Sequence, residues 1–205
     1  MEKTALITGG TTRLGAYIAS GLRVSGWRVV TTSHRAGAGA DFTVDFTDPG
    51  APARCAGILR MEKPRLVVNN AALFSGGGSE LMRVNYELPR AITEAAAGCG
   101  TRVVVNILDI RILSDQADPL NAYERSKRAL LAATYEDARR FLGTMRVNAV
   151  APGPVLAPVS VHEKAGVTPF GRPGPEDIAE AVRYLAEAER VTGAVIPVDG
   201  GRRFT

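Results

Sequence analysis

The sequence TALITGGTTRLG, residues 4–15, joins a short β-branched run to a glycine-rich turn, and an apolar pattern of helical spacing follows it through Leu22. A strand, a glycine-rich turn and a helix in this order are typical of phosphate-binding sites, because the first N–H groups of the helix and its dipole attract an anion. Gly9 is expected to allow the tight turn, and Gly15 to let the helix start close to the strand. The alternative is an ordinary glycine-rich connection without a ligand.

Six further runs of strand character alternate with helical patterns along the chain. This alternation predicts an α/β fold of one domain, residues 1–205, with a doubly wound, Rossmann-type parallel sheet of seven strands. Residues 36–40 are too few and too glycine-rich for a crossover helix, so that helix is expected to be lost or reduced to a turn. The expected strands are 4–8, 27–32, 42–46, 65–69, 101–108, 145–151 and 194–199; further helices are expected over 49–61, over 80–99 with a kink near Pro89, from Asn121, and over 175–185.

The composition is that of an ordinary globular protein, with 205 residues, 45% hydrophobic and 22% charged. No window approaches 18 continuous apolar residues, and Met1-Glu2-Lys3 leads directly into the first strand, so a cytoplasmic protein without membrane association is expected. Cys55 and Cys99 are far apart, which predicts packing roles and neither a disulfide nor a metal site. The net charge of +4 comes from scattered Lys and Arg without an aromatic-rich basic stripe, which argues against nucleic acid as a partner.

The segment NAYERSK, residues 121–127, places Tyr123 and Lys127 four residues apart, on one face of a predicted helix. Asn121 and Glu124 have the spacing of a capping box at its start. A phenol with a pKa of about 10 is a poor acid at neutral pH, and a nearby ammonium is expected to lower the pKa of Tyr123. Tyr123 is therefore a candidate proton donor, and the alternative is a solvated surface pair.

The ends of the second, third and fourth predicted strands carry further candidate groups. Residues 33–35 are Ser-His-Arg, without the acidic residue that would hold a ribose 2′-hydroxyl, so they favour the 2′-phosphate of NADP. For His34 the alternative is a surface imidazole. Asp45 is placed to meet an adenine amino group. The amides of Asn69 and Asn70 are expected to brace the turn after the fourth strand, the alternative being contact with a ligand.

Several motifs follow the order and approximate spacing of the short-chain dehydrogenase/reductase family, which the chain resembles over nearly its whole length. They are Thr8-Gly9 with Gly15, Asp45, Asn69-Asn70-Ala71, Asn85, Tyr123-x-x-x-Lys127, Pro152-Gly153 and Val198-Asp199-Gly200-Gly201. The resemblance implies that Tyr123 donates or accepts the proton, that Lys127 holds the cofactor ribose and lowers the Tyr123 pKa, and that Asn85 relays protons through a water to Lys127. The expected NADP contacts are Gly9, Thr11, Thr12, Arg13, Leu14, Gly15, Ser33, His34, Arg35, Asp45, Asn70, Ala71, Ala72, Lys127, Pro152, Gly153 and Val155.

Two departures from the usual family pattern narrow the resemblance. Arg13 stands where the loop usually has a glycine, and Asp109 lies one place before the usual active-site serine position, which Ile110 occupies. In these two features the chain resembles pteridine reductases and the dihydromonapterin or dihydrofolate reductases of the short-chain type, which share the arginine in the loop and an aspartate in place of the serine. In such a protein Phe74 would stack a pterin against the nicotinamide, and Asp109 would orient the pterin and share the proton path with Tyr123.

The expected substrate residues are thus Arg13, Phe74, Asp109 and Tyr123. Each has a plainer alternative: a solvent-facing loop side chain for Arg13, ordinary packing for Phe74, and a carboxylate that caps a turn for Asp109. Residues 156–175 are rich in Pro and Gly and are expected to form a compact cover.

The leading functional prediction is an NADPH-dependent reductase of a pterin, dihydropterin or dihydrofolate. One alternative is a general NADP-dependent carbonyl or ketone reductase, and another is a non-catalytic NADP-binding interaction module. The resemblance also implies a homo-oligomer, either a tetramer or a dimer.

Overall fold

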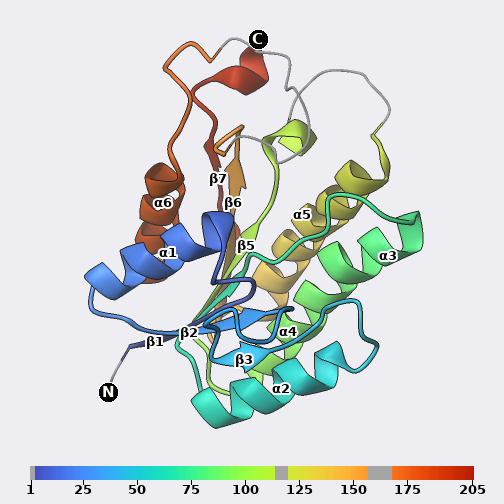
Figure 1. Cartoon of the computed structure of the whole chain (residues 1–205). Helices are drawn as coiled ribbons and strands as arrows, with labels where there is room; N and C mark the ends of the chain where they lie inside the picture. Colours follow the sequence, from blue (N-terminus) through green and yellow to red (C-terminus); the bar gives the residue numbers. More distant parts are fainter. Residues whose placement is uncertain (1–2, 114–119, 157–167) are drawn as a thin grey trace.

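The structure is a computed structural model that describes residues 3–113, 120–156 and 168–205. Its described residues form one parallel sheet of order β3-β2-β1-β4-β5-β6-β7, with helices on both faces (Figure 1). This arrangement confirms the predicted doubly wound α/β fold. The strands are β1 (Thr4–Ile7), β2 (Arg28–Ser33), β3 (Phe42–Thr43), β4 (Leu66–Asn69), β5 (Val103–Ile107), β6 (Arg146–Pro152) and β7 (Val195–Val198).

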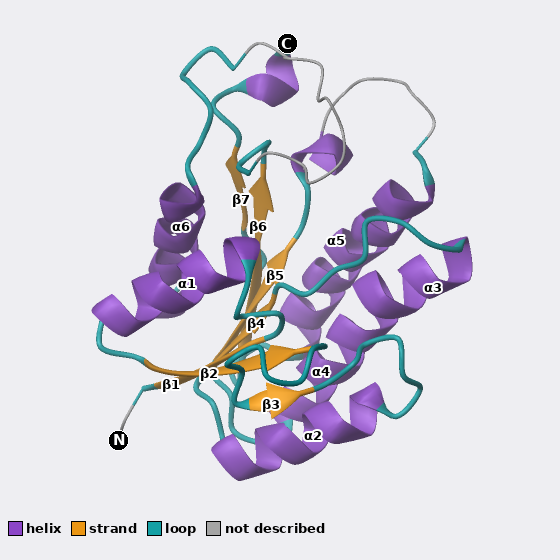
Figure 2. Ribbon diagram, viewed as in Figure 1, coloured by secondary structure: helices purple, strands orange, loops and turns teal. Residues whose placement is uncertain are grey.

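Two helical layers enclose the sheet, with α1 and α6 on one face and α2, α4 and α5 on the other (Figure 2). Successive strand residues point to opposite faces: Ile7 joins an apolar cluster with Ile18 and Ile178, whereas Leu6 joins one with Leu59. Burial on both faces explains why the strands are nearly continuous apolar runs. The helices are α1 (Arg13–Val24), α2 (Ala51–Glu62), α3 (Gly78–Met82), α4 (Leu88–Ala97), α5 (Ala122–Arg140) and α6 (Pro175–Glu187), with short helical turns η1 (Arg83–Glu87), η2 (Ile110–Leu113) and η3 (Arg202–Phe204).

Two expected elements differ in the structure. The third strand was expected over residues 42–46 but has two residues, because the Asp45 carboxylate accepts the N–H of Thr47 and turns the chain. The helix expected over 80–99 is divided by the π-helical turn η1, where the Leu88 N–H donates to the Arg83 carbonyl, just before Pro89. Proline lacks the N–H that a continuous α-helix needs, so the predicted kink takes the form of this wider turn.

The sheet order places the expected ligand site at the carboxyl ends of the strands. The chain builds β1, β2 and β3 outward in one direction and then β4 to β7 in the other, so the connections diverge between β1 and β4. Ligands of such sheets bind at the carboxyl ends of the strands, near this switch point.

Residues 36–40 form turns and not a helix, as expected. Among the described helices, none is long and apolar enough to cross a membrane.

Candidate active site

The glycine turn after β1 is tightly constrained. Gly9 has a φ of 63°, and a Cβ on Gly15 would lie only 2.0 Å from the Gly9 carbonyl oxygen. The Asn70 amide donates to the carbonyls of Thr8 and Gly9 at 2.9 and 3.1 Å, so it braces the segment after β4 against the glycine turn after β1. Only glycine at these two positions lets the start of α1 approach β1 so closely.

The N-terminus of α1 lies at the glycine turn, where an anion would meet the helix dipole. The N-cap residue Thr12 makes no side-chain capping hydrogen bond, so the first N–H groups of the helix are not taken up by that side chain. Arg13 follows with a φ of 49°, a backbone conformation that residues other than glycine rarely adopt, and its side chain is exposed. First-turn N–H groups that the Thr12 side chain does not engage, together with a nearby guanidinium, form a site that fits a pyrophosphate.

The end of β2 lies beside this turn and is basic. The Thr32 hydroxyl accepts the Gly9 N–H at 3.3 Å, so the two segments are in direct contact. The Ser33 hydroxyl accepts the Arg35 N–H at 3.1 Å, and the exposed Arg35 side chain donates to His34 at 3.2 Å. Two exposed basic side chains at this position fit an additional phosphate group, as the sequence predicted for NADP.

The helix that carries Tyr123 and Lys127 begins as predicted. The Asn121 side chain accepts the Glu124 N–H at 3.0 Å, and the Glu124 carboxylate accepts the Asn121 N–H at 3.0 Å, a complete capping box. Tyr123 and Lys127 are both buried, so they are not the solvated surface pair of the alternative. The capping box therefore fixes where the first turn of α5 presents Tyr123.

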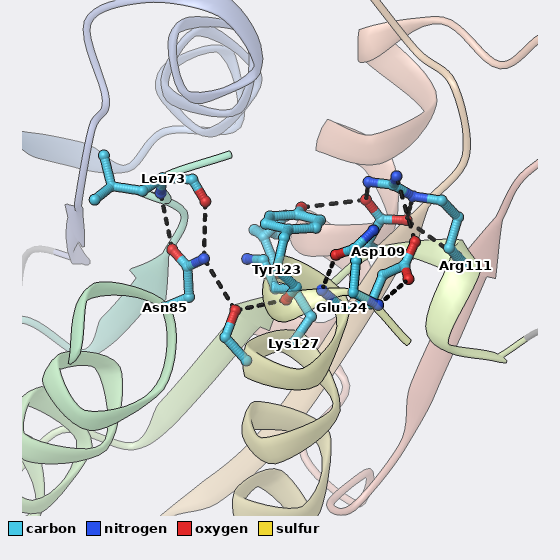
Figure 3. Close-up of polar contacts among 10 residues, drawn as sticks. Leu73, Asn85, Asp109, Arg111, Tyr123, Glu124 and Lys127 are labelled. Carbon is cyan, nitrogen blue, oxygen red and sulfur yellow. Dashed lines mark hydrogen bonds and ion pairs between the residues drawn. The ribbon is translucent and has the colours of Figure 1, made fainter. Parts of the chain in front are cut away.

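Asp109 joins this helix to the end of β5 (Figure 3). The Tyr123 hydroxyl donates to the Asp109 carboxylate at 3.1 Å, although Asp109 lies one residue further from Tyr123 in sequence than the family pattern expects. Lys127 Nζ donates to the Ile107 carbonyl at 2.8 Å and lies 5.9 Å from the centre of the Tyr123 ring. The structure thus brings together three of the four predicted catalytic residues.

Arg111 was not predicted and contacts the same carboxylate. Its backbone N–H and Nε donate to one Asp109 oxygen at 3.0 and 3.1 Å, and its Nη2 donates to the other at 2.9 Å (Figure 3). Its Nη1 lies 3.5 Å from a carboxylate oxygen of Glu124. The sequence held a signal for this residue, an arginine two places after a candidate carboxylate, although nothing local indicated that Glu124 would complete the arrangement.

The charges of the site shift each other's pKa. Burial opposes ionisation of Asp109, but the hydrogen bonds and charge of Arg111 prevail and hold its pKa below the usual value. Burial first, and then the Asp109 charge, raise the pKa of Tyr123 well above its ordinary value. Burial also lowers the pKa of Lys127, to about 8. The predicted lowering of the Tyr123 pKa is wrong, because desolvation of the phenolate and a carboxylate within hydrogen-bond distance dominate and raise it.

Asn85 has a different arrangement from the expected relay. Its amide oxygen accepts the Leu73 N–H at 2.8 Å, and its amide nitrogen donates to the Leu73 carbonyl at 2.8 Å and to the Ser126 hydroxyl at 3.1 Å. The Asn85 side chain therefore braces the loop after β4 against α5, and its described hydrogen bonds do not include Lys127. A relay of protons through this residue stays a prediction.

Phe74 lies at the end of this braced loop. Its ring stacks on the Tyr123 ring with centroids 5.1 Å apart and an interplanar angle of 25°, while 69% of the residue is exposed. Such exposure does not agree with the alternative of ordinary core packing. The structure therefore places an exposed aromatic ring against the ring of the candidate proton donor.

The remaining predicted residues lie at or near the carboxyl ends of the strands. Gly153, after β6, donates its N–H to the Val198 carbonyl at 2.8 Å, and a Cβ there would meet Asp199 at 2.8 Å. Val155 packs against the apolar cluster around β1 and α1. Asp45 is exposed, and its carboxylate accepts hydrogen bonds from Thr47. Thr11, Leu14, Ala71, Ala72 and Pro152 are half-buried in the turns around the site, and much of the expected cover over 156–175 lies outside the described residues.

The fold and the site define an oxidoreductase with a dinucleotide site, and the chain belongs to the short-chain dehydrogenase/reductase family. A family model described as enoyl-(acyl carrier protein) reductase matches residues 79–203, more than half of the chain. The granaticin polyketide synthase putative ketoacyl reductase 2 of Streptomyces violaceoruber is 30% identical, over 96% of this chain and 94% of the relative. The rhamnolipids biosynthesis 3-oxoacyl-(acyl-carrier-protein) reductase of Pseudomonas aeruginosa is 28% identical, over 97% and 95%.

A solved structure adds a different likeness. The crystal structure of FolM alternative dihydrofolate reductase 1 from Brucella canis, complexed with NADP, matches with a TM-score of 0.83 at 26% identity. The match covers 98% of this chain and 94% of that one. The relatives therefore include proteins named for ketoacyl reduction and a protein named for dihydrofolate reduction.

Proposed function

We propose that this NADP-dependent oxidoreductase reduces a pterin, a dihydropterin or dihydrofolate. The observation that carries the proposal is the pairing of Tyr123 with Asp109 at 3.1 Å beneath the exposed, stacked ring of Phe74. A flat heterocycle gains contact area on an aromatic face, and a buried phenol beside it is placed to protonate a ring nitrogen. The likeness to a FolM alternative dihydrofolate reductase supports the same substrate class.

NADP fits the residues around the glycine turn. The N-terminus of α1, which has no side-chain cap from Thr12, suits the pyrophosphate, and His34 and Arg35 suit the 2′-phosphate. Lys127 lies at the carboxyl end of β5, where the resemblance expects it to hold the ribose. The bound cofactor supplies the hydride.

In the proposed reaction Tyr123 gives its proton to the substrate nitrogen. Its O–H bond breaks, the N–H bond of the product forms, and the electron pair stays on the phenolate oxygen. Before the transfer Asp109 holds the hydroxyl, and the O–H turns from this carboxylate to the substrate nitrogen as the proton is given. Phe74 covers the ring of Tyr123 and limits its contact with water. The direct role expected for Asp109, orientation of the pterin, would require its oxygens to give up hydrogen bonds that they already accept from Arg111 and Tyr123.

A general carbonyl reductase is the second candidate, because two of the relatives are named for reduction of a 3-oxoacyl or ketoacyl group. For such a substrate Asp109 is an unfavourable neighbour, since the oxyanion that develops on the carbonyl would face a carboxylate. The exchange Asp109→Ser separates the two candidates. It is expected to impair pterin reduction more than diketone reduction, because the diketone alone gains from removal of the carboxylate that its oxyanion would face, and equal effects on both would contradict this distinction.

The assay that tests the proposal follows NADPH oxidation with dihydrobiopterin, dihydromonapterin, dihydrofolate, quinones and diketones in parallel, with NADH as a control. Preferential turnover of a dihydropterin is expected. The variant Tyr123→Phe is expected to lose activity by a factor of about 100 to 10,000 and to keep NADPH binding, because only the proton donor is removed. Turnover of diketones or quinones alone would overturn the pterin assignment, and tight NADPH binding without any turnover would support a non-catalytic binding module.

A further inference from the structure

While Tyr123 donates to it, the Asp109 carboxylate has no acceptor position left for a substrate. An ionised carboxylate offers about four lone-pair positions. Four hydrogen bonds reach Asp109: the backbone N–H and the Nε of Arg111 on one oxygen, and Arg111 Nη2 with the Tyr123 hydroxyl on the other. The paired N–H donors of a pterin edge would have to compete with these bonds.

Arg111 also links the two segments that build the site. Its guanidinium lies between Asp109, at the end of β5, and Glu124, in the first turn of α5, and its centre is 5.2 Å from the centre of the Tyr123 ring. Glu124 is itself held by the capping box with Asn121. A planar fork that bonds two oxygens of one carboxylate while facing a second carboxylate is a geometry that lysine does not offer.

The position of the positive charge of Arg111, beside Asp109 and Tyr123, matters for the reaction. When Tyr123 gives up its proton, a phenolate forms within hydrogen-bond distance of the Asp109 carboxylate, and two negative charges at that separation repel each other. The Arg111 guanidinium adjoins both groups and offsets this repulsion. Without Arg111, the anion at Asp109 would oppose the proton transfer that the site has to perform.

We propose that Arg111 is a positioning residue for the reaction: it fixes the Asp109 carboxylate against the Tyr123 hydroxyl, offsets its charge, and keeps it from binding substrate directly. The proposal rests on the proposed function only in requiring that Tyr123 be the proton donor, and it holds for a pterin or for a ketone. Substrate recognition then falls to the Tyr123 hydroxyl and the Phe74 ring.

The test compares Arg111→Met and Arg111→Lys with the control Arg128→Met, which removes an exposed arginine elsewhere on α5. Steady-state kinetics use whichever panel substrate the wild type reduces. For Arg111→Met we expect kcat to fall about 100-fold, as for loss of one charge-stabilising donor, with KM and NADPH affinity nearly unchanged. Arg111→Lys is expected to restore part of kcat, and Arg128→Met to behave as the wild type.

A double variant separates charge compensation from a merely structural role. If Arg111 offsets the Asp109 charge, Arg111→Met combined with Asp109→Asn is expected to be more active than Arg111→Met alone, because the uncompensated anion is gone. A purely structural residue would show no such recovery. A second readout needs no turnover: carboxyl 13C NMR titration is expected to give a higher Asp109 pKa in Arg111→Met than in the wild type.

Each other outcome overturns the inference in a recognisable way. A raised KM with unchanged kcat would make Arg111 a direct substrate ligand, and a lowered KM would make it a competitor that substrate displaces. Unchanged kinetics in Arg111→Met would show that the ion pair between Arg111 and Asp109 has no role in the reaction. If the wild type reduced no substrate of the panel, the proposed function would fail by itself, and an Asp109 pKa that did not rise in the variant would refute the role of Arg111 independently.

Discussion

At the scale of single residues, the buried ammonium of Lys127 makes stability depend on pH. Its pKa falls from 10.5 to about 8 on burial, so between pH 8 and pH 10 the unfolded chain still holds a proton that the folded protein has released. The free energy of unfolding is therefore expected to rise with pH in this window, by up to about 1.4 kcal/mol per pH unit for one proton. Urea denaturation at pH 7.5, 8.5 and 9.5 measures this slope.

The variant Lys127→Met provides the comparison, because it carries no proton to release. The slope attributable to Lys127 is expected to vanish in it, and equal slopes in both proteins would contradict the assignment. The rise of the free energy of unfolding with pH is expected to end near pH 10, because folding raises the pKa of Tyr123 above its ordinary value of 10.0. Above that pH the unfolded tyrosine loses a proton that the folded one keeps, so stability is expected to fall.

At the scale of secondary-structure elements, Arg146 of β6 stabilises the end of α6. Its guanidinium donates to the carbonyls of Leu185, Ala186 and Val191 at 2.8, 3.0 and 3.2 Å. The first two belong to the last turn of the helix, where carbonyls have no partner within the helix. Arg146→Met is expected to lower the free energy of unfolding by about 3 kcal/mol, because charge-assisted bonds are lost and buried acceptors are left unpaired.

The matched control for this prediction lies on the same helix. Arg183 pairs with Glu180 and Glu187 on the exposed face of α6, where solvent screens the charges. Arg183→Met is expected to change the urea midpoint far less than Arg146→Met. Similar shifts in both variants would show that the carbonyl contacts of Arg146 contribute nothing special.

At the scale of the whole molecule, the positive charge is less scattered than the sequence suggested. Five basic side chains surround a cavity of about 710 Å³ at the end of the sheet opposite to the active site. The helices α2, α4 and α5 end near this cavity, and cations stabilise the negative C-terminal ends of helices. Two of these side chains have polar partners there: Arg146 donates to the last carbonyls of α6, and Arg65 lies 3.8 Å from Glu189, which also lines the cavity. The five basic residues are Lys63, Arg65, Arg102, Arg146 and Arg190.

The homo-oligomer implied by the family resemblance is a second feature of the whole molecule. Strand β7 ends the sheet order, has four half-buried residues, and pairs only with β6 among the residues that the structure describes, so its other edge could accept a strand of another chain. We expect a dimer or tetramer at micromolar concentration. Sedimentation velocity over a range of concentrations measures this state, and a monomer throughout would contradict the expectation.

Much of the fold was predictable because it rests on local patterns. The glycine spacing from Gly9 to Gly15, the capping box of Asn121 and Glu124, and the alternation of strands with helices each depend on neighbouring residues. Periodicity and turn chemistry act over a few residues, so they can be read without a structure. The short β3 was missed because a side-chain bond from Asp45 outweighed strand propensity at the sheet edge.

The chemistry of the site was only partly contained in the sequence. By itself the sequence determined the doubly wound fold, the glycine turn, the basic end of β2 and the placement of Tyr123 and Lys127 on one helix. Only the tertiary structure decided that Arg111 donates hydrogen bonds to the Asp109 carboxylate, that Phe74 stacks on Tyr123, and that the Tyr123 pKa rises. The physical reason is that a pKa and a hydrogen-bond partner depend on burial and on charges from distant segments, which meet only when the end of β5 packs against α5.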